Sequence, residues 1–263
     1  MTIVAARQDQ ALRRVISAFV AELEALVPQT KEVTTRSAAS DERHLRDRAG
    51  RGMVLLTDAL QTLGSPTTTR PESWGTHLRH RALAEQALAE VSESVLGRDS
   101  AASLTHQARR LLADVVTELD HPKLPAAVDT LFGVARLIDY LRGSLVDAVS
   151  VSLRHGCPAP AIALTEATRA LAIALGERHP GATLEVRVPP AAAVQLDALG
   201  EGPVHTRGTP PNVIELPVEL FLELTTGLRR WDERVAETYA SGAHVNAFEA
   251  MLPVIDLGRR QLL

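Results

Sequence analysis

The chain has 263 residues, which is enough for two domains of ordinary size or one large domain. Hydrophobic residues make up 45% of it but aromatic residues only 3%, a composition that favours close-packed helices over packed sheets. The formal net charge of −4 argues against a general nucleic-acid binder, which usually carries a basic face. A single cysteine excludes an internal disulfide and gives no sign of an oxidising compartment.

Neither a signal peptide nor a membrane span is expected. Residues 1–6 form too short an apolar stretch for a signal peptide, because Arg7 and Asp9 follow at once. No run approaches 18 uncharged apolar residues, so no segment predicts a transmembrane helix. We therefore expect a cytoplasmic protein.

The first part of the chain shows the periodicity of amphipathic helices. Between Ala5 and Val27, apolar residues recur at steps of three and four, and Pro28 ends the run. The same pattern recurs between loops rich in proline and polar residues, without a strand signal. The expected helices cover residues 5–27, 40–64, 73–96, 100–119 and 127–154. They predict an all-α helical bundle over residues 1–156.

The last hundred residues mix helix and strand. After a helix expected at 159–178, Leu184, Val186 and Val188 alternate with charged residues, which is the pattern of a half-buried strand. The other expected elements are strands at 193–197 and 212–216, a helix at 217–226, and a last helix with Trp231, Val235 and Tyr239 on one face. Residues 157–263 are therefore expected to form a small domain, and the fold class of the whole chain is α+β.

The longest run with a family resemblance is GPVHTRGTPPNVIE, from Gly202 to Glu215. Together with Val186–Pro190 (VRVPP), Trp231, Ser241-Gly242 and Leu252-Pro253, it resembles a sterol-carrier-like domain of actinobacteria, the bacterial sterol carrier ortholog. The resemblance covers nearly all of the C-terminal region. It implies an α+β carrier fold that binds an apolar or lipid-like small molecule.

Two N-terminal segments resemble a second family. HLRDRA (His44–Ala49) and ARLIDYLRGSLVDAVSV (Ala135–Val151) are similar to two helices of the mycothiol-dependent maleylpyruvate isomerase N-terminal family, a DinB-like four-helix bundle. The resemblance implies a metal held by a His on one helix and by a Glu and a His, four residues apart, on another. Residues four apart on a helix share a face, so both can reach one ion.

The metal positions of that family are only partly filled in this chain. Aligned on the Asp-Tyr-Leu of residues 139–141, they fall on His44, Asp147 and Val151. Valine cannot ligate a metal, and aspartate is one methylene shorter than glutamate. Because a catalytic zinc normally keeps three protein ligands, we expect a vestigial site with no metal, no other cofactor and no catalytic residue.

Four residues are candidates for ligand binding in the carrier region. His205 and Arg207 are expected at the mouth of a pocket, with Arg207 as a forked donor to an anion or carboxylate, and Phe221 and Trp231 are expected in its wall. Two alternatives stay open. In the first, the polar residues of the loop at 202–211 only stabilise a fixed turn and bind no ligand. In the second, Phe221 and Trp231 belong to the packed core and line no pocket.

Two further patterns have ordinary explanations. His77 and His80 could face a shared metal, but the flanking Arg79 and Arg81 favour a solvated helix face. Cys157, two residues from His155, could be a nucleophile, but a lone cysteine in a linker is more often incidental.

Three hypotheses for function follow. The first is a non-enzymatic, sterol-carrier-like protein that binds an apolar small molecule beside a bundle without metal. The second is a metal- and mycothiol-dependent isomerase or transferase. The third is a scaffold or interaction protein with no small ligand. No nucleic-acid partner is expected, and the sequence names no protein partner.

Overall fold

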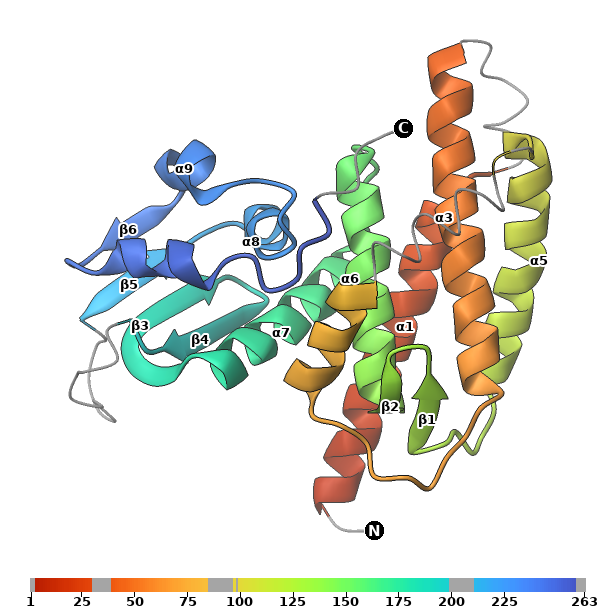
Figure 1. Ribbon diagram of the computed structural model, residues 1–263, viewed down its shortest axis with the longest axis horizontal. Helices are drawn as coiled ribbons and strands as arrows, with labels where there is room; N and C mark the ends of the chain where they lie inside the picture. Colours follow the sequence, from red (N-terminus) through yellow and green to blue (C-terminus); the bar gives the residue numbers. More distant parts are fainter. Residues whose placement is uncertain (1–2, 30–38, 85–96, 98, 199–210, 259–263) are drawn as a thin grey trace. The chain divides into compact units, whose positions relative to one another are not determined.

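A computed structural model describes residues 3–29, 39–84, 97, 99–198 and 211–258 (Figure 1). The chain divides into two compact units, Met1–Ala163 and Leu164–Leu263. Helices come first and a mixed region with a four-stranded sheet follows, so the predicted α+β class is confirmed. The predicted boundary between residues 156 and 157 stays a prediction.

The first unit is built on helices whose apolar stripes face one another. On α1 the residues Phe19, Leu23 and Leu26, at steps of four and three, are fully buried. Ser100 caps α5 by accepting a hydrogen bond from the backbone N–H of Ser103. Helix α1 packs against α6, and α3 packs against α5. The helices are α1 (Ile3–Leu26), α3 (Ala39–Leu63), a helical stretch over residues 74–84, α5 (Ala101–Leu119) and α6 (Leu137–Arg154).

A β-hairpin precedes α6, where the sequence pattern predicted the start of a long helix. Strands β1 (Ala127–Thr130) and β2 (Gly133–Arg136) pair antiparallel. Gly133 has φ +100°, a conformation that favours glycine, and the Thr130 hydroxyl donates to its carbonyl at 2.7 Å. The prediction of helix over residues 127–136 was therefore wrong, because the turn chemistry of this segment prevails over its apolar spacing.

The second unit contains the four-stranded sheet. Its strands lie in the order β4 (Ala192–Leu196), β3 (Pro180–Val188), β5 (Asn212–Glu215) and β6 (Tyr239–Ser241), with β3 and β5 parallel and the other neighbours antiparallel. The predicted strands at 184–188, 193–197 and 212–216 thus form one sheet. The helices of this unit are α7 (Ala161–Arg178), whose first residues belong to the first unit, α8 (Val218–Thr225) and α9 (Trp231–Arg234).

The two faces of the sheet differ in polarity. Leu184, Val186 and Ile214 lie on one face and are fully buried. Helix α7 lies on this face, since a Cβ on Gly176 would meet Val194 of β4 at 3.2 Å. The opposite face carries Glu185, Arg187 and Glu215. The apolar core of the unit therefore lies on the α7 side of the sheet.

The last predicted helix is much shorter than its spacing suggested. Helix α9 ends at Arg234, a 3-10 turn covers Val235–Glu237, and Tyr239 begins β6 with 66% of its surface exposed. Trp231 and Tyr239 therefore do not share a helix face. The residues after 238 pair with the free edge of β5 instead. No described helix is both long and apolar enough to span a membrane.

Candidate functional site

The three positions aligned with metal ligands differ in their surroundings. His44, on α3, is exposed and its ring meets that of His155 edge-on, with 5.5 Å between centroids. Asp147 and Val151 are buried on α6, and Asp147 is paired with Arg81. The described residues contain no group of three or more His, Cys, Asp or Glu side chains suited to hold a metal. The residues present therefore do not fit the metal expected from the resemblance, and the interpretation of these positions as vestigial stays a prediction.

His155 forms a hydrogen bond that the sequence did not indicate. Its Nε2 lies 2.7 Å from Oδ2 of Asp47, and its side chain is 2% exposed. Burial alone would raise the pKa of Asp47, but the hydrogen bond with His155 and the nearby Arg51 hold it below its usual value. The Cys157 thiol donates to the His155 backbone carbonyl at 3.8 Å. These contacts attach the end of α6 to α3.

The most unusual feature of the first unit is a set of buried polar side chains. Arg81, 2% exposed, donates from Nε and Nη2 to Oδ2 of Asp147 at 3.0 and 2.7 Å, and Nη2 also lies 3.3 Å from the Ser144 hydroxyl. The Tyr140 hydroxyl donates to Oδ2 of Asp58 at 2.7 Å. We call this set, with His77, the Arg81 cluster: Asp58, His77, Arg81, Tyr140, Ser144 and Asp147.

The surrounding structure makes room for Arg81 and closes over it. A Cβ on Gly143 would lie 3.2 Å from the Arg81 Cδ, so the glycine leaves space beside α6. Phe132, in the hairpin turn, lies over the guanidinium with 4.7 Å between Cζ and the ring centroid. The same ring meets His77 edge-on at 6.0 Å. Phe132 therefore contacts both the charged Arg81 and the neutral His77.

Burial and attraction act differently on the two ionic partners. Burial lowers the pKa of Arg81, but attraction to Asp147, Asp58 and Tyr140 and the hydrogen bond to Asp147 together more than offset this, and the pKa lies above its usual value. Burial also raises the pKa of Asp147, and Arg81 opposes this without cancelling it. We take the pair as ionised at neutral pH, because two guanidinium nitrogens contact one carboxylate oxygen.

Several atoms of the Arg81 cluster have no hydrogen-bond partner among the described residues. They are Nη1 of Arg81, Oδ1 of Asp147, Oδ1 of Asp58, and both ring nitrogens of His77. A buried polar atom without a partner costs about 1–3 kcal/mol. A hydrogen bond to water or to another polar group would offset this cost.

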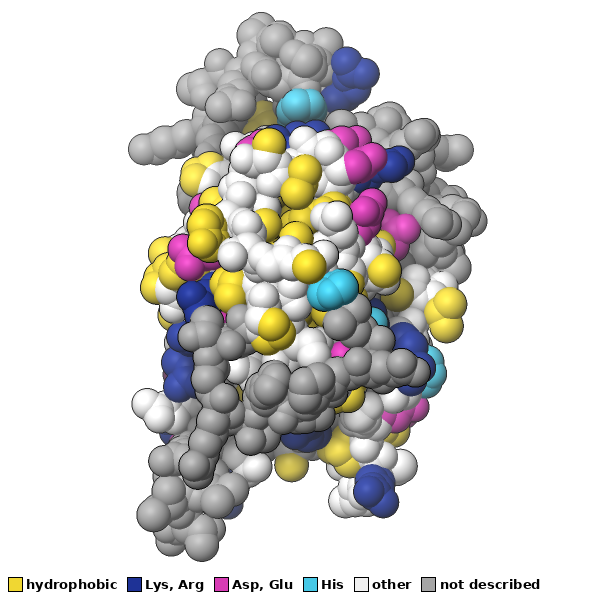
Figure 2. Space-filling model, turned by 90° about the vertical axis from the view of Figure 1, so that its left-hand side faces the viewer, with side chains coloured by type: hydrophobic (Ala, Val, Ile, Leu, Met, Phe, Trp, Pro, Cys, Tyr) yellow, Lys and Arg dark blue, Asp and Glu magenta, His cyan; other side chains and the backbone are white. Residues whose placement is uncertain are grey.

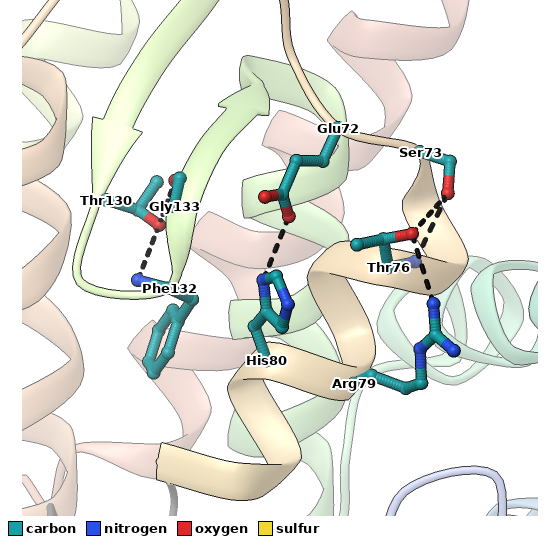
Figure 3. A network of polar contacts seen from close by, with 8 residues as sticks. All are labelled: Glu72, Ser73, Thr76, Arg79, His80, Thr130, Phe132 and Gly133. Carbon is teal, nitrogen blue, oxygen red and sulfur yellow. Dashed lines mark hydrogen bonds and ion pairs between the residues drawn. The ribbon is translucent and has the colours of Figure 1, made fainter.

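His77 and His80 do not share a solvated helix face. His77 is completely buried, and burial, together with Arg81 and His80, lowers its pKa to about 4. The expectation of a solvated face was therefore wrong for His77. His80 is 45% exposed, and its Nδ1 lies 3.0 Å from Glu72, as Figure 3 shows beside the Phe132 hairpin. His77 packs against the rings of Trp74 and Phe132, whereas His80 contacts Glu72, so the structure gives no sign that the two histidines share a metal.

A buried glutamate lies elsewhere in the bundle. Glu22 of α1 accepts a hydrogen bond from the Ser152 hydroxyl at 2.5 Å, while its Oε2 has no partner among the described residues. Burial raises the pKa of Glu22 to about 7, although the hydrogen bond from Ser152 opposes the rise. Near neutral pH this carboxyl is therefore poised to gain or lose a proton.

Both predicted wall residues of the carrier region are buried. Phe221 on α8 is completely buried, and Trp231 is 5% exposed. Trp231 packs edge-on against Phe248 with 5.4 Å between ring centroids. The predicted mouth residues, His205 and Arg207, lie outside the described residues.

Each unit has a surface hollow over described residues. Neither is lined by Phe221, Trp231 or the Arg81 cluster. The hollow of about 430 Å³ in the second unit is lined by Arg187, Pro189, Pro190, Ala191, Ala192, Ala193 and Glu215. The hollow of about 320 Å³ in the first unit is lined by Leu63, Pro66, Glu118, His121, Lys123, Leu124 and Pro125.

Sequence reasoning missed the Arg81 cluster, although part of its signal was present. Tyr140, Ser144 and Asp147 fall at steps of four and three and so form a polar stripe on one face of α6. Gly143 inside the same helix indicated a close approach by another group. The partner, Arg81, lies 66 residues from Asp147, and no local pattern could identify it.

The fold places the chain in the class of two-unit proteins with a leading helical bundle and a small α+β unit. Within it, residues 161–254 match the family described as Bacterial SCP ortholog. This match confirms the resemblance of the C-terminal region to sterol-carrier-like domains. No curated protein has significant sequence similarity to this chain.

Two solved structures of mycothiol-dependent maleylpyruvate isomerase are similar to this chain. A histidine-to-alanine mutant of that enzyme shares 13% identity with a TM-score of 0.45, over 89% of this chain and 92% of the other. A second structure of the enzyme shares 12% identity with a TM-score of 0.42, over 83% of this chain and 88% of the other.

Proposed function

We propose that this is a non-enzymatic, cytoplasmic protein whose C-terminal unit binds an apolar, lipid-like small molecule. The match of residues 161–254 to the bacterial SCP family carries the proposal. An apolar core between α7 and one face of the sheet is the layer in which such a ligand would be held. Carrier sites bury most of the ligand surface and orient it with few polar groups.

The ligand would lie against Phe221 and Trp231. Because these side chains are packed in the core, binding requires some of them to move. The segment 231–251 is suited to this, since it consists of a four-residue helix, two 3-10 turns and a three-residue strand. Short elements with few backbone hydrogen bonds open at lower cost than long helices. Separation of the Trp231–Phe248 pair would open this part of the core.

The face drawn in Figure 2 offers no continuous apolar patch for a superficial site. Figure 2 shows the side on which β6 and α9 lie in Figure 1, and hydrophobic side chains coloured there are scattered among polar groups and backbone. An apolar ligand is held more tightly in an enclosed layer than on such a mixed surface. His205 and Arg207 are proposed as the polar groups at the entrance.

The pairing of Asp147 with Arg81 favours the non-enzymatic hypothesis over the metal-dependent isomerase. A carboxylate held by two guanidinium nitrogens is a poor metal ligand, and Val151 supplies no donor atom. The filled core of the second unit favours the third hypothesis, a scaffold with no small ligand. The following titration distinguishes the carrier from the scaffold.

Trp231 is a reporter of binding once the only other tryptophan, Trp74, is replaced. In Trp74→Phe protein, a long-chain fatty acid or a sterol should change Trp231 fluorescence saturably, because the ligand displaces its Phe248 contact. Trp231→Phe protein, which keeps Trp74, is the matched control and should show no change. Arg207→Ala should weaken the fatty acid more than the sterol. A flat titration with both ligands would reject the carrier and leave the scaffold.

A further inference from the structure

In the second unit the chain leaves the end of α8 and later returns to the same place. Gly227, with φ +72°, turns the chain away from the helix towards α9 and β6 (Figure 1). On its return, three backbone N–H groups donate to carbonyls at the end of α8: Val254 and Ile255 to Thr225, at 2.8 and 3.1 Å, and Leu257 to Thr226, at 2.9 Å. We call this junction the neck, and residues 228–253 the 228–253 loop.

The neck is closely packed. All five residues that form its hydrogen bonds are buried. Nη1 of Arg178, at the end of α7, donates to the Val254 carbonyl at 2.6 Å. The backbones of Gly227 and Gly258 approach so closely that a Cβ on Gly258 would overlap the Gly227 carbonyl. Buried hydrogen bonds and close packing therefore hold the two sides of the neck together.

The 228–253 loop is attached much more weakly than its neck. The structure describes all of its residues, and among them only Trp231, Phe248 and Met251 are buried. Beyond the neck, its hydrogen bonds to the rest of the unit go to β5. The exposed strand β6 pairs with β5 over three residues, and the His244 backbone N–H donates to Oδ1 of Asn212 at 2.9 Å.

We propose that the 228–253 loop opens as one cooperative unit while the neck stays closed. The Trp231–Phe248 contact joins the two arms of the loop, so structure on both arms should be lost together. Segments with few buried apolar contacts and exposed hydrogen bonds open at lower cost than the core. Opening uncovers the edge of β5 and the apolar side chains of the loop. It is a property of the free protein and does not rest on the carrier function.

Hydrogen exchange of the full-length protein without ligand tests this opening. Amides of β6 and of the 3-10 turn η2 (Val245–Met251) should exchange through one shared opening. Their protection should be at least about tenfold lower than that of the neck amides of Val254, Ile255 and Leu257. Fraying from the end of the chain would give the opposite order, because the neck lies nearer the last residue.

A reversible crosslink tests whether the loop opens as a unit. In a Cys157→Ser background, Glu215→Cys and Tyr239→Cys place two thiols opposite each other on β5 and β6, within the range of a disulfide. Oxidation should slow exchange across the whole loop, including η2, and reduction should restore it. The matched control, Glu185→Cys with Gln195→Cys, joins β3 to β4 and should leave exchange in the loop unchanged.

Neck amides that exchange as fast as those of the loop would overturn the proposal. So would loop amides that exchange only through global unfolding, with the same urea dependence as amides of β3. A crosslink that slows exchange in β6 alone would show that the loop is not one unit. The comparison of loop and neck in the wild-type protein stands even if a crosslinked variant does not fold. The carrier titration can fail without changing any of these results.

Discussion

Replacement of Glu22 by glutamine should stabilise the protein at alkaline pH and have little effect in mild acid. Burial raises the pKa of Glu22 to about 7 from the ordinary 4.5. A carboxyl whose pKa is raised by folding favours the folded state at low pH, and this advantage is lost as the pH rises from about 4.5 through about 7. Glutamine keeps the shape and can still accept the Ser152 hydrogen bond, but it never carries the buried charge.

The expected size follows from these two pKa values. The ionisation of Glu22 should cost about 1 kcal/mol of unfolding free energy at pH 5 and about 3 kcal/mol at pH 8. Relative to wild type, Glu22→Gln should therefore gain about 2 kcal/mol more at pH 8 than at pH 5. Urea denaturation of both proteins at the two pH values measures this difference directly.

The matched control for this prediction lies two residues away on the same helix. Glu24 is exposed, so Glu24→Gln should change stability equally at the two pH values. If Glu22→Gln gives the same stability difference at pH 5 and pH 8, or destabilises the protein at pH 8, the reasoning from burial is refuted.

Three other predictions follow from the bundle and the junction. Arg81→Met should lower the free energy of unfolding in urea by about 3–5 kcal/mol, because it leaves Asp147 buried and unpaired. Adding Asp147→Leu should restore most of this stability, and a double variant no more stable than the single one would contradict the ion pair. Elemental analysis of the purified protein should find no stoichiometric zinc, and one tightly held zinc per chain that is lost in His44→Ala would revive the enzyme hypothesis. Limited proteolysis at 155–159 should leave a folded helical fragment, whereas two unfolded halves would indicate one cooperative domain.

The sequence predicted the helices and strands whose structure follows from the spacing of their own apolar residues. Alternation of Leu184, Val186 and Val188 with charged residues predicted β3, and the apolar stripe of residues 12–26 predicted most of α1. It failed where tertiary pairing competes with local spacing. Trp231, Val235 and Tyr239 have helical spacing, but Tyr239 pairs with Glu215 across β5 and β6. The edge of β5 with which Tyr239 pairs forms only when the sheet folds, so the spacing of nearby residues cannot predict it.

The candidate sites show the same limit. The resemblance drew attention to Asp147 on α6, but it could not show that Arg81 forms an ion pair with this carboxylate. His77 was misjudged because its burial depends on Phe132, in a hairpin that the helical pattern concealed. Long-range contacts between residues about fifty or more positions apart leave no periodic trace in a single sequence.

Native mass spectrometry of the full-length protein, purified without detergent, tests the carrier function most directly. We expect a fraction of the molecules to carry a co-purified apolar compound, released by organic solvent and bound again when a fatty acid or sterol is added. Trp231→Ala should lose this adduct, and Trp74→Phe should keep it. A single mass equal to that of the bare chain, unchanged by any added lipid, would contradict the account.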